Sequence, residues 1–229
     1  FRMKALVSAL EKYKQSGLEV DLITTMPSRY EKFNGKAKAF EDFGWLRIHR
    51  INLPNHSNSM FSQSRSYVSY IVGVLKIASN KDCDVVFATS SRLMTSVLGA
   101  LISKIKHASL YLDIRDIFTD NLDELFRNSP FRILNKCFKL LERYSIKTAI
   151  KVNVVSPGFI EHIKYNNCKV EPSLFTNGVD DIFANHDFNI PDFKNKVPLI
   201  VYAGNFGAGQ SLHNIIPRSA KLLKNKANF

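Results

Sequence analysis

The sequence predicts an α/β protein built on a parallel β-sheet with helices on both faces. Short apolar runs of strand type alternate along most of the chain with helical stretches of about 10 to 20 residues. The runs are also apolar almost without interruption, as in DVVFAT (84–89), which is typical of strands buried on both faces of a sheet. Together these patterns indicate a doubly wound, Rossmann-like arrangement.

The first predicted element is a helix, because apolar residues recur there at helical spacing before Gly17, a helix stop signal. These residues are Met3, Leu6, Val7 and Leu10. The run 18–24 (LEVDLIT) is then a strand. A doubly wound domain normally opens with a strand and a phosphate-binding turn ahead of its first helix. We therefore expect the first strand of this domain to be missing.

The same alternation continues to about residue 175. The predicted strands cover residues 46–51, 84–89, 109–112, 151–155 and 172–175. The predicted helices cover residues 63–79, 94–105 and 130–150, with a short one after Ser156 that ends at Tyr165. Pro130 fits the first turn of the third helix, where its missing N–H costs nothing.

A change of pattern marks a second domain. The stretch 184–196 (ANHDFNIPDFKNK) is polar and has no hydrophobic period, so it is expected to be a linker. A strand at 198–203 (PLIVYA), a glycine-rich turn and a helix at 210–226 follow. One such unit cannot bury a core alone, so we expect this domain to be cut short. The predicted organisation is a domain at 1–183, a linker at 184–196 and the start of a second domain at 197–229.

Composition narrows the class of protein. The chain is 45% hydrophobic and carries a net charge of +12, which indicates an anionic partner such as nucleic acid, acidic lipid or a phosphorylated molecule. No apolar run approaches the roughly 20 residues that span a bilayer. Cys83, Cys137 and Cys168 lack metal-ligand spacing and fit reduced thiols in the cytoplasm. The histidines form no metal-binding pattern, so no metal is expected.

The glycine-rich turn is the first candidate site. Gly204, Gly207 and Gly209 lie between a predicted strand and a predicted helix. Glycine lets the backbone approach a phosphate there, and the free N–H groups of the helix start supply partial positive charge. The alternative is a tight turn that needs glycine for its geometry and binds nothing.

The second candidate site is the segment LDIRDIF (112–118). Asp113, Arg115 and Asp116 follow a buried strand at the carboxyl end of the sheet, where open α/β folds bind ligands. These side chains could hold a sugar hydroxyl, orient a base or hold one another. The alternative is an ion pair of Arg115 with a carboxylate that only caps the loop.

These segments, together with VVSPG (154–158), TNGVD (176–180) and YAGNFGAGQSL (202–212), occur in an order that resembles glycosyltransferase family 4. The chain is most similar to the WbuB-like bacterial group of O-antigen and other polysaccharide enzymes. The resemblance implies a GT-B fold of two Rossmann-like domains, the first binding the acceptor. It implies retaining transfer from a UDP-sugar, including N-acetylated deoxy-hexosamines, to a lipid-linked or saccharide acceptor in lipopolysaccharide or other surface polysaccharide synthesis. No metal or further cofactor is implied.

The resemblance also implies roles for individual residues. Asp113, Arg115 and Asp116 fall on the acceptor-domain loop that faces the cleft and are the predicted catalytic residues. The predicted donor-binding residues lie before and after the linker: Asn177, Asp180, Gly204, Asn205, Gly207 and Gln210. Ala208 stands where relatives often place a basic residue, so phosphate charge must be neutralised elsewhere. The glutamates that hold the donor would lie beyond Phe229, so this chain itself is expected to be inactive.

One face of the predicted helix 130–150 is basic. Its cations follow one another at steps of 4, 3, 4 and 4 residues and are Arg132, Lys136, Lys139, Arg143 and Lys147. The ordinary interpretation is a solvated helix face. The alternative is contact with an anionic membrane surface, which gains about 1 kcal/mol for each Lys or Arg. A cytoplasmic location is expected, and peripheral attachment to the inner face of the membrane is the alternative to a solvated helix face.

Two other functions compete with sugar transfer. The first is a non-catalytic basic protein that binds nucleic acid or an anionic surface. Nucleic acid is disfavoured as a partner because the sequence has no recognised module and no face that interleaves basic and aromatic residues. The second is a nucleotide-binding domain of the epimerase or dehydrogenase kind, which is disfavoured because no G-x-G-x-x-G follows a strand.

Overall fold

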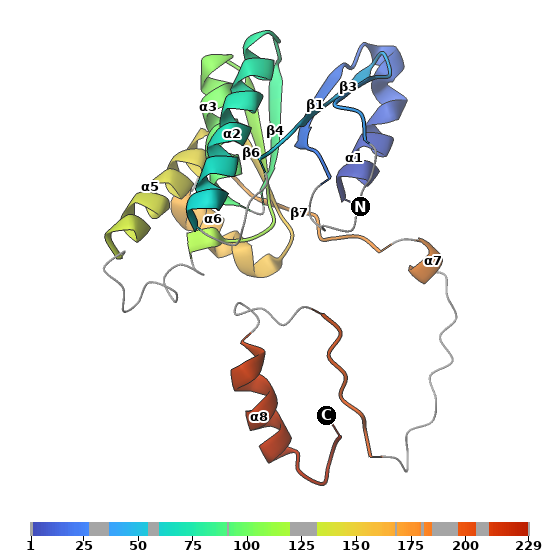
Figure 1. The fold of residues 1–229 in the computed structure, drawn as a ribbon, viewed down its shortest axis with the longest axis vertical. Coiled ribbons are helices and arrows are strands. Elements are labelled where there is room, and N and C mark those ends of the chain that lie inside the picture. The colour runs from blue at the N-terminus through green and yellow to red at the C-terminus, as the bar shows by residue number, and fades with distance from the viewer. Residues whose placement is uncertain are drawn as a thin grey trace. The chain divides into compact units, whose positions relative to one another are not determined.

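The computed structural model describes most of the 229 residues. The described ranges are 2–27, 37–54, 60–90, 92–119, 132–167, 169–179, 181–184, 197–204 and 211–228. The chain divides into two compact units, Phe1–Gly178 and Val179–Phe229 (Figure 1). The larger unit is an α/β structure with a parallel four-stranded sheet, compatible with a Rossmann-like fold.

The larger unit begins with a helix and a small sheet. Its elements are α1 (Arg2–Leu10), the 3-10 helix η1 (Glu11–Ser16), β1 (Val20–Thr25), β2 (Phe40–Asp42) and β3 (Leu46–Ile51). The strand order is β1-β3-β2, with β1 parallel and β2 antiparallel to β3. Gly17 ends the helical segment at φ 82°, as its role of stop signal predicts. β2 was not predicted from the sequence, because its three residues carry no clear strand period.

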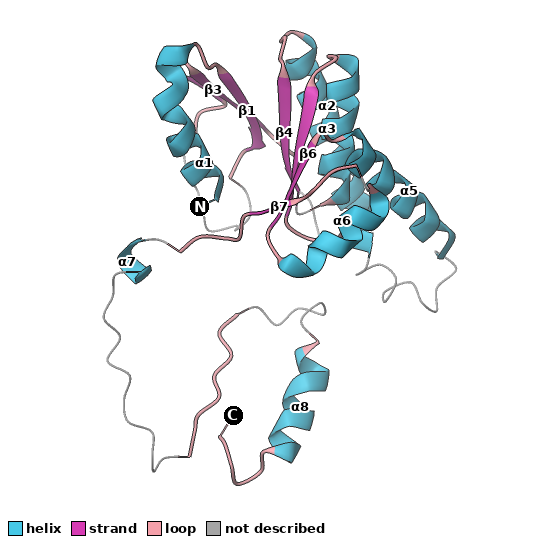
Figure 2. Cartoon of the chain, turned by 180° about the vertical axis from the view of Figure 1, so that it is seen from behind, coloured by secondary structure: helices cyan, strands magenta, loops and turns pink. Residues whose placement is uncertain are grey.

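The second sheet contains the remaining strands of this unit. It comprises β4 (Val85–Ser90), β5 (Ser109–Ile114), β6 (Lys151–Val154) and β7 (Ser173–Leu174), all parallel and in that order (Figure 2). The helical elements of this region are α2 (Met60–Ser79), α3 (Leu93–Ile105), α5 (Arg132–Thr148), η2 (Pro157–Phe159) and α6 (Ile160–Asn166). The predicted start of α5 at Pro130 lies outside the described residues.

The hydrophobic core lies between this sheet and its helices. Alternate strand residues point to one face and bury almost completely, and Leu112 and Val154 are both 0% exposed. Ala100 of α3, Ile146 of α5 and Ile163 of α6 close the core from the helical side. The other face of the strands carries Phe87, Tyr111, Asp113 and Asn153, and this face builds the candidate site.

The prediction of a parallel sheet with crossover helices is confirmed, but the larger unit has two sheets. β1 ends one sheet and β4 ends the other. A doubly wound sheet places a strand between the strands equivalent to these two. No strand formed by the described residues takes that place, so β1 and β4 are both edge strands here.

The smaller unit contains α7 (Asp181–Ala184) and α8 (Leu212–Leu222). The predicted helix after the glycine turn is present as α8. The predicted strand at 198–203 is not, because the segment forms only one isolated bridge among the described residues, from Leu199 to Asn228. A strand needs a neighbour along its length to satisfy its backbone groups. The predicted linker lies almost wholly outside the described residues.

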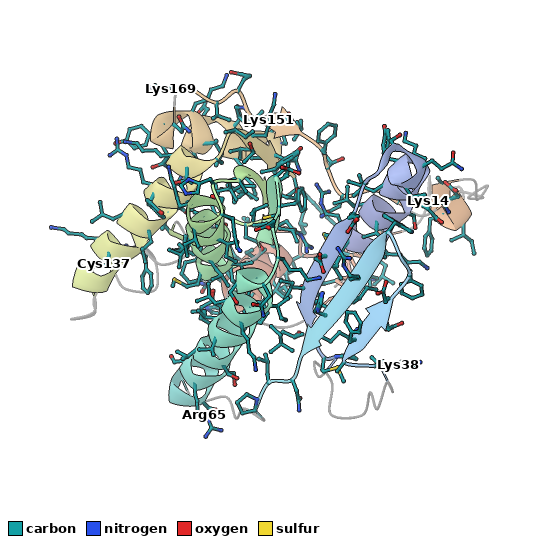
Figure 3. The ribbon with its side chains drawn as sticks, turned by 90° about the horizontal axis from the view of Figure 1, so that it is seen from above. Lys14, Lys38, Arg65, Cys137, Lys151 and Lys169 are labelled. Atoms are coloured by element: carbon teal, nitrogen blue, oxygen red, sulfur yellow. The ribbon has the colours of Figure 1, made fainter. Side chains whose placement is uncertain are left out.

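Basic side chains are distributed over the larger unit. Exposed examples lie on helices, strands and the segments between them, namely Lys14, Lys38, Arg65, Lys151 and Lys169 (Figure 3). The net charge of +12 therefore does not come from a single patch. Within the described part of the chain, no helix combines the length and the apolar character needed to cross a membrane.

Candidate functional site

The candidate site is built around Asp113, near the carboxyl end of β5. Strand register places Thr89 of β4 and Asn153 of β6 on either side of it. Thr89 Oγ1 donates a hydrogen bond of 2.9 Å to Asp113 Oδ2, and Asn153 Nδ2 donates one of 2.5 Å to Oδ1. Three adjacent strands are thus joined through one carboxylate.

Arg2 of α1 completes this network. Its Nε donates to Asp113 Oδ2 at 3.0 Å and its Nη2 to Oδ1 at 2.7 Å, which is the paired geometry that a guanidinium favours with a carboxylate. The same guanidinium donates to the backbone oxygens of Phe175 and Thr176, each at 3.1 Å. Arg2 therefore ties the first helix both to β5 and to the segment after β7.

The surroundings of Asp113 stabilise its charged form. Its side chain is only 2% exposed, and burial alone would raise the pKa of the carboxyl group. Hydrogen bonds from Arg2, Asn153 and Thr89, with the charge of Arg2, outweigh burial and hold the pKa below its ordinary value. The carboxylate accepts four hydrogen bonds and stays ionised at neutral pH. This is the geometry of an anchoring group, and a catalytic role for Asp113 stays a prediction.

A cavity of about 240 Å³ lies over the same sheet face. Its lining is mostly apolar, with Arg2, Asp113 and Asn153 as the main polar groups. The lining residues are Arg2, Met3, Leu6, Phe87, Tyr111, Asp113, Asn153 and Phe175. Phe87 and Tyr111 meet edge to face, with ring centroids 5.2 Å apart. The cavity is smaller than the roughly 300 Å³ at which ligand pockets begin, so it fits only part of a larger ligand.

Arg115 and Asp116 lie just beyond the anchored carboxylate. Both are exposed in the loop after β5. Because the four strands are parallel, Asn177, which follows β7 and is also exposed, lies along the same edge of the sheet. Among the described residues, no ion pair joins Arg115 to Asp113 or Asp116. The partner of Asp113 is Arg2.

Three residues of this network were not predicted from the sequence: Arg2, Thr89 and Asn153. Thr89 ends one predicted strand and Asp113 directly follows another, so these two could have been placed at the same edge of the sheet. Asn153 lies in the middle of its predicted strand, and only the strand register brings it to the same face. Nothing in the local sequence points to Arg2, which is 111 residues from Asp113.

The predicted donor-binding residues fall into two groups. Asn177 belongs to the larger unit, and Gly204 is exposed in the smaller one. A Cβ at Gly204 would lie 2.6 Å from Tyr202 Oη, so the glycine leaves room for that ring. The other members lie outside the described residues, and they are Asp180, Asn205, Gly207 and Gln210.

The basic face of α5 is a second surface of interest. Lys136, Lys139, Arg143 and Lys147 are exposed, whereas Glu142 on the same helix is buried. Glu142 accepts a hydrogen bond from Thr119 and contacts His162, so it faces away from the cations. The side chain of Arg132 lies outside the described part of the helix.

Within the described ranges, no three His, Cys, Asp or Glu side chains gather into a group that could hold a metal ion. The chain matches no protein-family model and no protein of curated function. Fold and site together thus define the class of protein as an α/β protein with a parallel, Rossmann-like sheet and polar groups at its carboxyl edge.

Proposed function

We propose that the chain belongs to a retaining glycosyltransferase of the GT-B type. Such an enzyme would transfer a sugar from a UDP-sugar to a lipid-linked or saccharide acceptor. The observation that carries the proposal is the set of exposed polar side chains at the carboxyl edge of the parallel sheet, Arg115, Asp116 and Asn177. The order of motifs along the sequence supports the same function.

The hydrogen-bond network around Asp113 supports the proposed sugar transfer, because it fixes the start of the loop that carries Arg115 and Asp116. Binding groups are most precise when rigid elements hold them. Arg2, Thr89 and Asn153 join α1, β4, β5 and β6 through the Asp113 carboxylate, two residues before Arg115. In the proposed enzyme Asp113 is thus a positioning residue.

The exposed residues have the chemistry to bind a saccharide. The Asp116 carboxylate accepts hydrogen bonds from sugar hydroxyls, and the Arg115 guanidinium donates to hydroxyl or phosphate oxygens. The Asn177 amide does both. In the smaller unit, the glycine turn that begins at Gly204 is proposed to face the diphosphate of the donor.

Isothermal titration calorimetry with two probes tests the proposal. The methyl glycoside of N-acetylglucosamine represents the acceptor, and UDP-N-acetylglucosamine represents the donor. We expect Arg115→Ala and Asp116→Asn to weaken glycoside binding by about tenfold each, because each removes a charged hydrogen-bonding group. Gly204→Val should weaken donor binding, because the new side chain blocks close approach of phosphate to the backbone.

Matched controls carry the same chemical change elsewhere on the surface. Arg65→Ala on α2 and Asp82→Asn before β4 remove exposed charges at positions outside the loop that carries Arg115 and Asp116. Both should bind the probes like the unaltered chain. The proposal fails if neither probe binds, or if the control variants lose binding as much as the loop variants.

A second candidate function is binding to an anionic membrane surface, alone or as the way a glycosyltransferase reaches a lipid-linked acceptor. The exposed cations of α5 favour it, since polybasic helix faces are attracted to acidic headgroups. Co-sedimentation with phosphatidylglycerol vesicles tests this candidate, which fails if Lys136→Gln and Lys139→Gln leave binding unchanged.

A further inference from the structure

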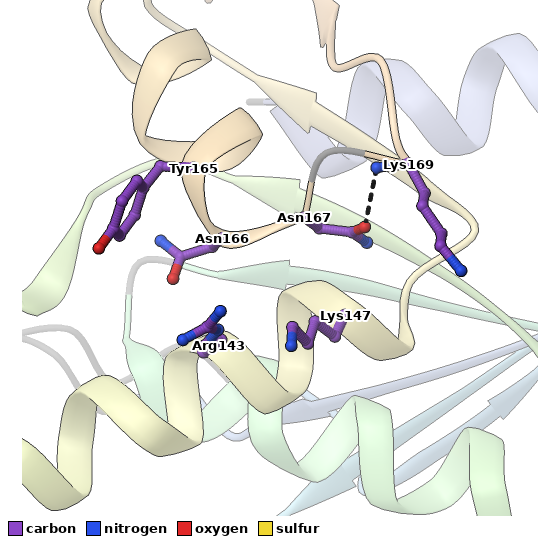
Figure 4. A pocket seen from close by; sticks show the side chains of 6 residues that line it. All are labelled: Arg143, Lys147, Tyr165, Asn166, Asn167 and Lys169. Atoms are coloured by element: carbon purple, nitrogen blue, oxygen red, sulfur yellow. Dashed lines mark hydrogen bonds between the residues drawn. The ribbon is translucent and has the colours of Figure 1, made fainter.

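A basic pocket of about 340 Å³ lies between the ends of α5 and α6. Arg143 and Lys147 of α5 form one wall, and the end of α6 with the following turn forms the other (Figure 4). The second wall consists of Tyr165, Asn166, Asn167 and Lys169.

Two buried asparagines hold the second wall in place. Asn167 donates its backbone N–H to the Ile163 oxygen at 2.8 Å and its side-chain Nδ2 to the Ile146 oxygen at 3.0 Å, which joins the end of α6 to α5. Its Oδ1 accepts a hydrogen bond of 3.2 Å from the Lys169 N–H. Asn166 donates to the His162 oxygen at 3.0 Å. Because Ile146 and Ile163 belong to the core, the pocket has rigid walls.

The pocket carries a concentrated positive charge. Arg143, Lys147 and Lys169 line it, and none of the described lining residues is acidic. Nearby acids are engaged elsewhere: Glu142 with Thr119 and His162, and Glu171 with Lys164 at 2.8 Å. Like charges around one hollow repel each other, and an anion with several acceptor oxygens would relieve that repulsion.

The chemistry of the lining suits a phosphate group. A guanidinium presents parallel donors that match phosphate oxygens, and lysine adds a mobile point charge. Tyr165 also lines the pocket and is 84% exposed, so its hydroxyl supplies a further donor at the rim. Both helices end where the next strands begin, so the pocket lies at the amino edge of the sheet, opposite Arg115 and Asp116.

We propose that this pocket binds a phosphate group, either free or on the headgroup of a membrane lipid. The phosphate site is independent of the proposed sugar transfer, because it shares no residue with the carboxyl edge of the sheet. Exposed Lys136 and Lys139 continue the positive surface along α5 away from the pocket. A headgroup phosphate could therefore enter the pocket while these lysines contact neighbouring headgroups.

Helix stability offers a different explanation for the same cations. Positive side chains near a helix C-terminus interact favourably with the helix dipole and need no ligand. That explanation predicts that removing the cations lowers the melting temperature in every salt alike. Phosphate binding predicts stabilisation that saturates with phosphate and depends on the pocket.

Thermal unfolding of the 229-residue chain, followed by circular dichroism, distinguishes the two. Inorganic phosphate is titrated against sodium chloride at equal ionic strength. We expect Tm to rise with phosphate to a plateau and not to rise with chloride. The double variant R143Q/K147Q should weaken phosphate binding by about tenfold or more, since two charge-assisted contacts are lost. Its Tm in chloride reports whether it still folds.

The matched control is K136Q/K139Q, which removes the same number of charges from the same helix outside the pocket. It should keep the response to phosphate. Equal responses to phosphate and chloride would overturn the proposal, as would an unchanged response in R143Q/K147Q. Binding of a single-stranded RNA through Arg143 and Lys147 without any saturable response to phosphate would also overturn it.

A vesicle experiment then identifies the source of the phosphate. Co-sedimentation compares pure phosphatidylcholine vesicles with vesicles that also contain phosphatidylglycerol, with and without inorganic phosphate. If a lipid headgroup fills the pocket, inorganic phosphate and R143Q/K147Q both reduce binding to the acidic vesicles. If a soluble phosphate fills it, phosphate raises Tm while vesicle binding depends only on Lys136 and Lys139. Either result supports the phosphate site.

Discussion

At the scale of single residues, two aspartates organise the larger unit, one buried and one partly exposed. Asp113 is buried and holds Arg2, Thr89 and Asn153. Asp21 on β1 is partly exposed and contacts Arg47, His49 and Lys81 at 3.0, 2.8 and 3.2 Å. Both remain ionised because hydrogen-bond donors surround them, and the two can be tested separately.

Arg2→Ala should destabilise the larger unit strongly. Removing the guanidinium leaves the Asp113 carboxylate buried beside two neutral donors, and breaking one side of a buried pair costs about 3 to 5 kcal/mol. Urea unfolding measures the change in the free energy of unfolding. Arg65→Ala, an exposed control on α2, should cost less than about 0.5 kcal/mol. Equal effects of the two substitutions would show that Arg2 does not anchor the sheet.

Acid should destabilise the protein partly through Asp21. Burial acts to raise its pKa, but hydrogen bonds from Arg47, His49 and Lys81 outweigh burial and lower the pKa to about 2. A depressed pKa means that this stabilisation is fully present above the ordinary value of 3.8 and is lost as pH falls toward 2. Unfolding measured across that window should lose stability less steeply in Asp21→Asn. The same slope in both proteins would contradict this assignment.

At the scale of elements, helix α3 packs closely against strand β4 because Gly99 has no side chain at the contact. A Cβ built at Gly99 would lie 2.7 Å from Ala88 Cβ, and neither atom can rotate away. Gly99→Ala should therefore force α3 off the sheet and cost about 1 to 2 kcal/mol, even after its gain in helix propensity.

Gly158→Ala is the matched control for that substitution. The nearest atom to a Cβ there is Ser156 Oγ at 3.8 Å, an ordinary contact, and the backbone needs no positive φ. Chemical denaturation should show no loss of stability for this variant. If Gly99→Ala is tolerated equally well, α3 does not pack against β4 as closely as described.

The elements that could be predicted are those whose own sequence carries a hydrophobic pattern of helix or strand type. β3 was predicted with the bounds it has, Leu46–Ile51, and α3 and α8 were found near their predicted positions. The prediction was wrong for 198–203, because an apolar run becomes a strand only beside a partner strand. It missed β2, which exists through its pairing with β3 and not through its own pattern.

At the scale of the whole molecule, long-range contacts decide what local patterns leave open. The exposed polar residues at the sheet edge could be located from LDIRDIF, because they follow a buried strand directly. The ion pair that anchors them could not be predicted, because Arg2 and Asp113 lie 111 residues apart in the sequence. The basic pocket was likewise hidden, because Lys169 joins Arg143 and Lys147 only once α6 packs on α5.

The most direct measurement of the central claim is a map of backbone amide chemical shifts with the methyl glycoside of N-acetylglucosamine. We expect saturable shifts of the Arg115, Asp116 and Asn177 amides, abolished in Asp116→Asn, with the amides of Arg143 and Lys147 unaffected. Shifts confined to α5, or none at the carboxyl edge of the sheet at saturating glycoside, would contradict the proposed glycosyltransferase site.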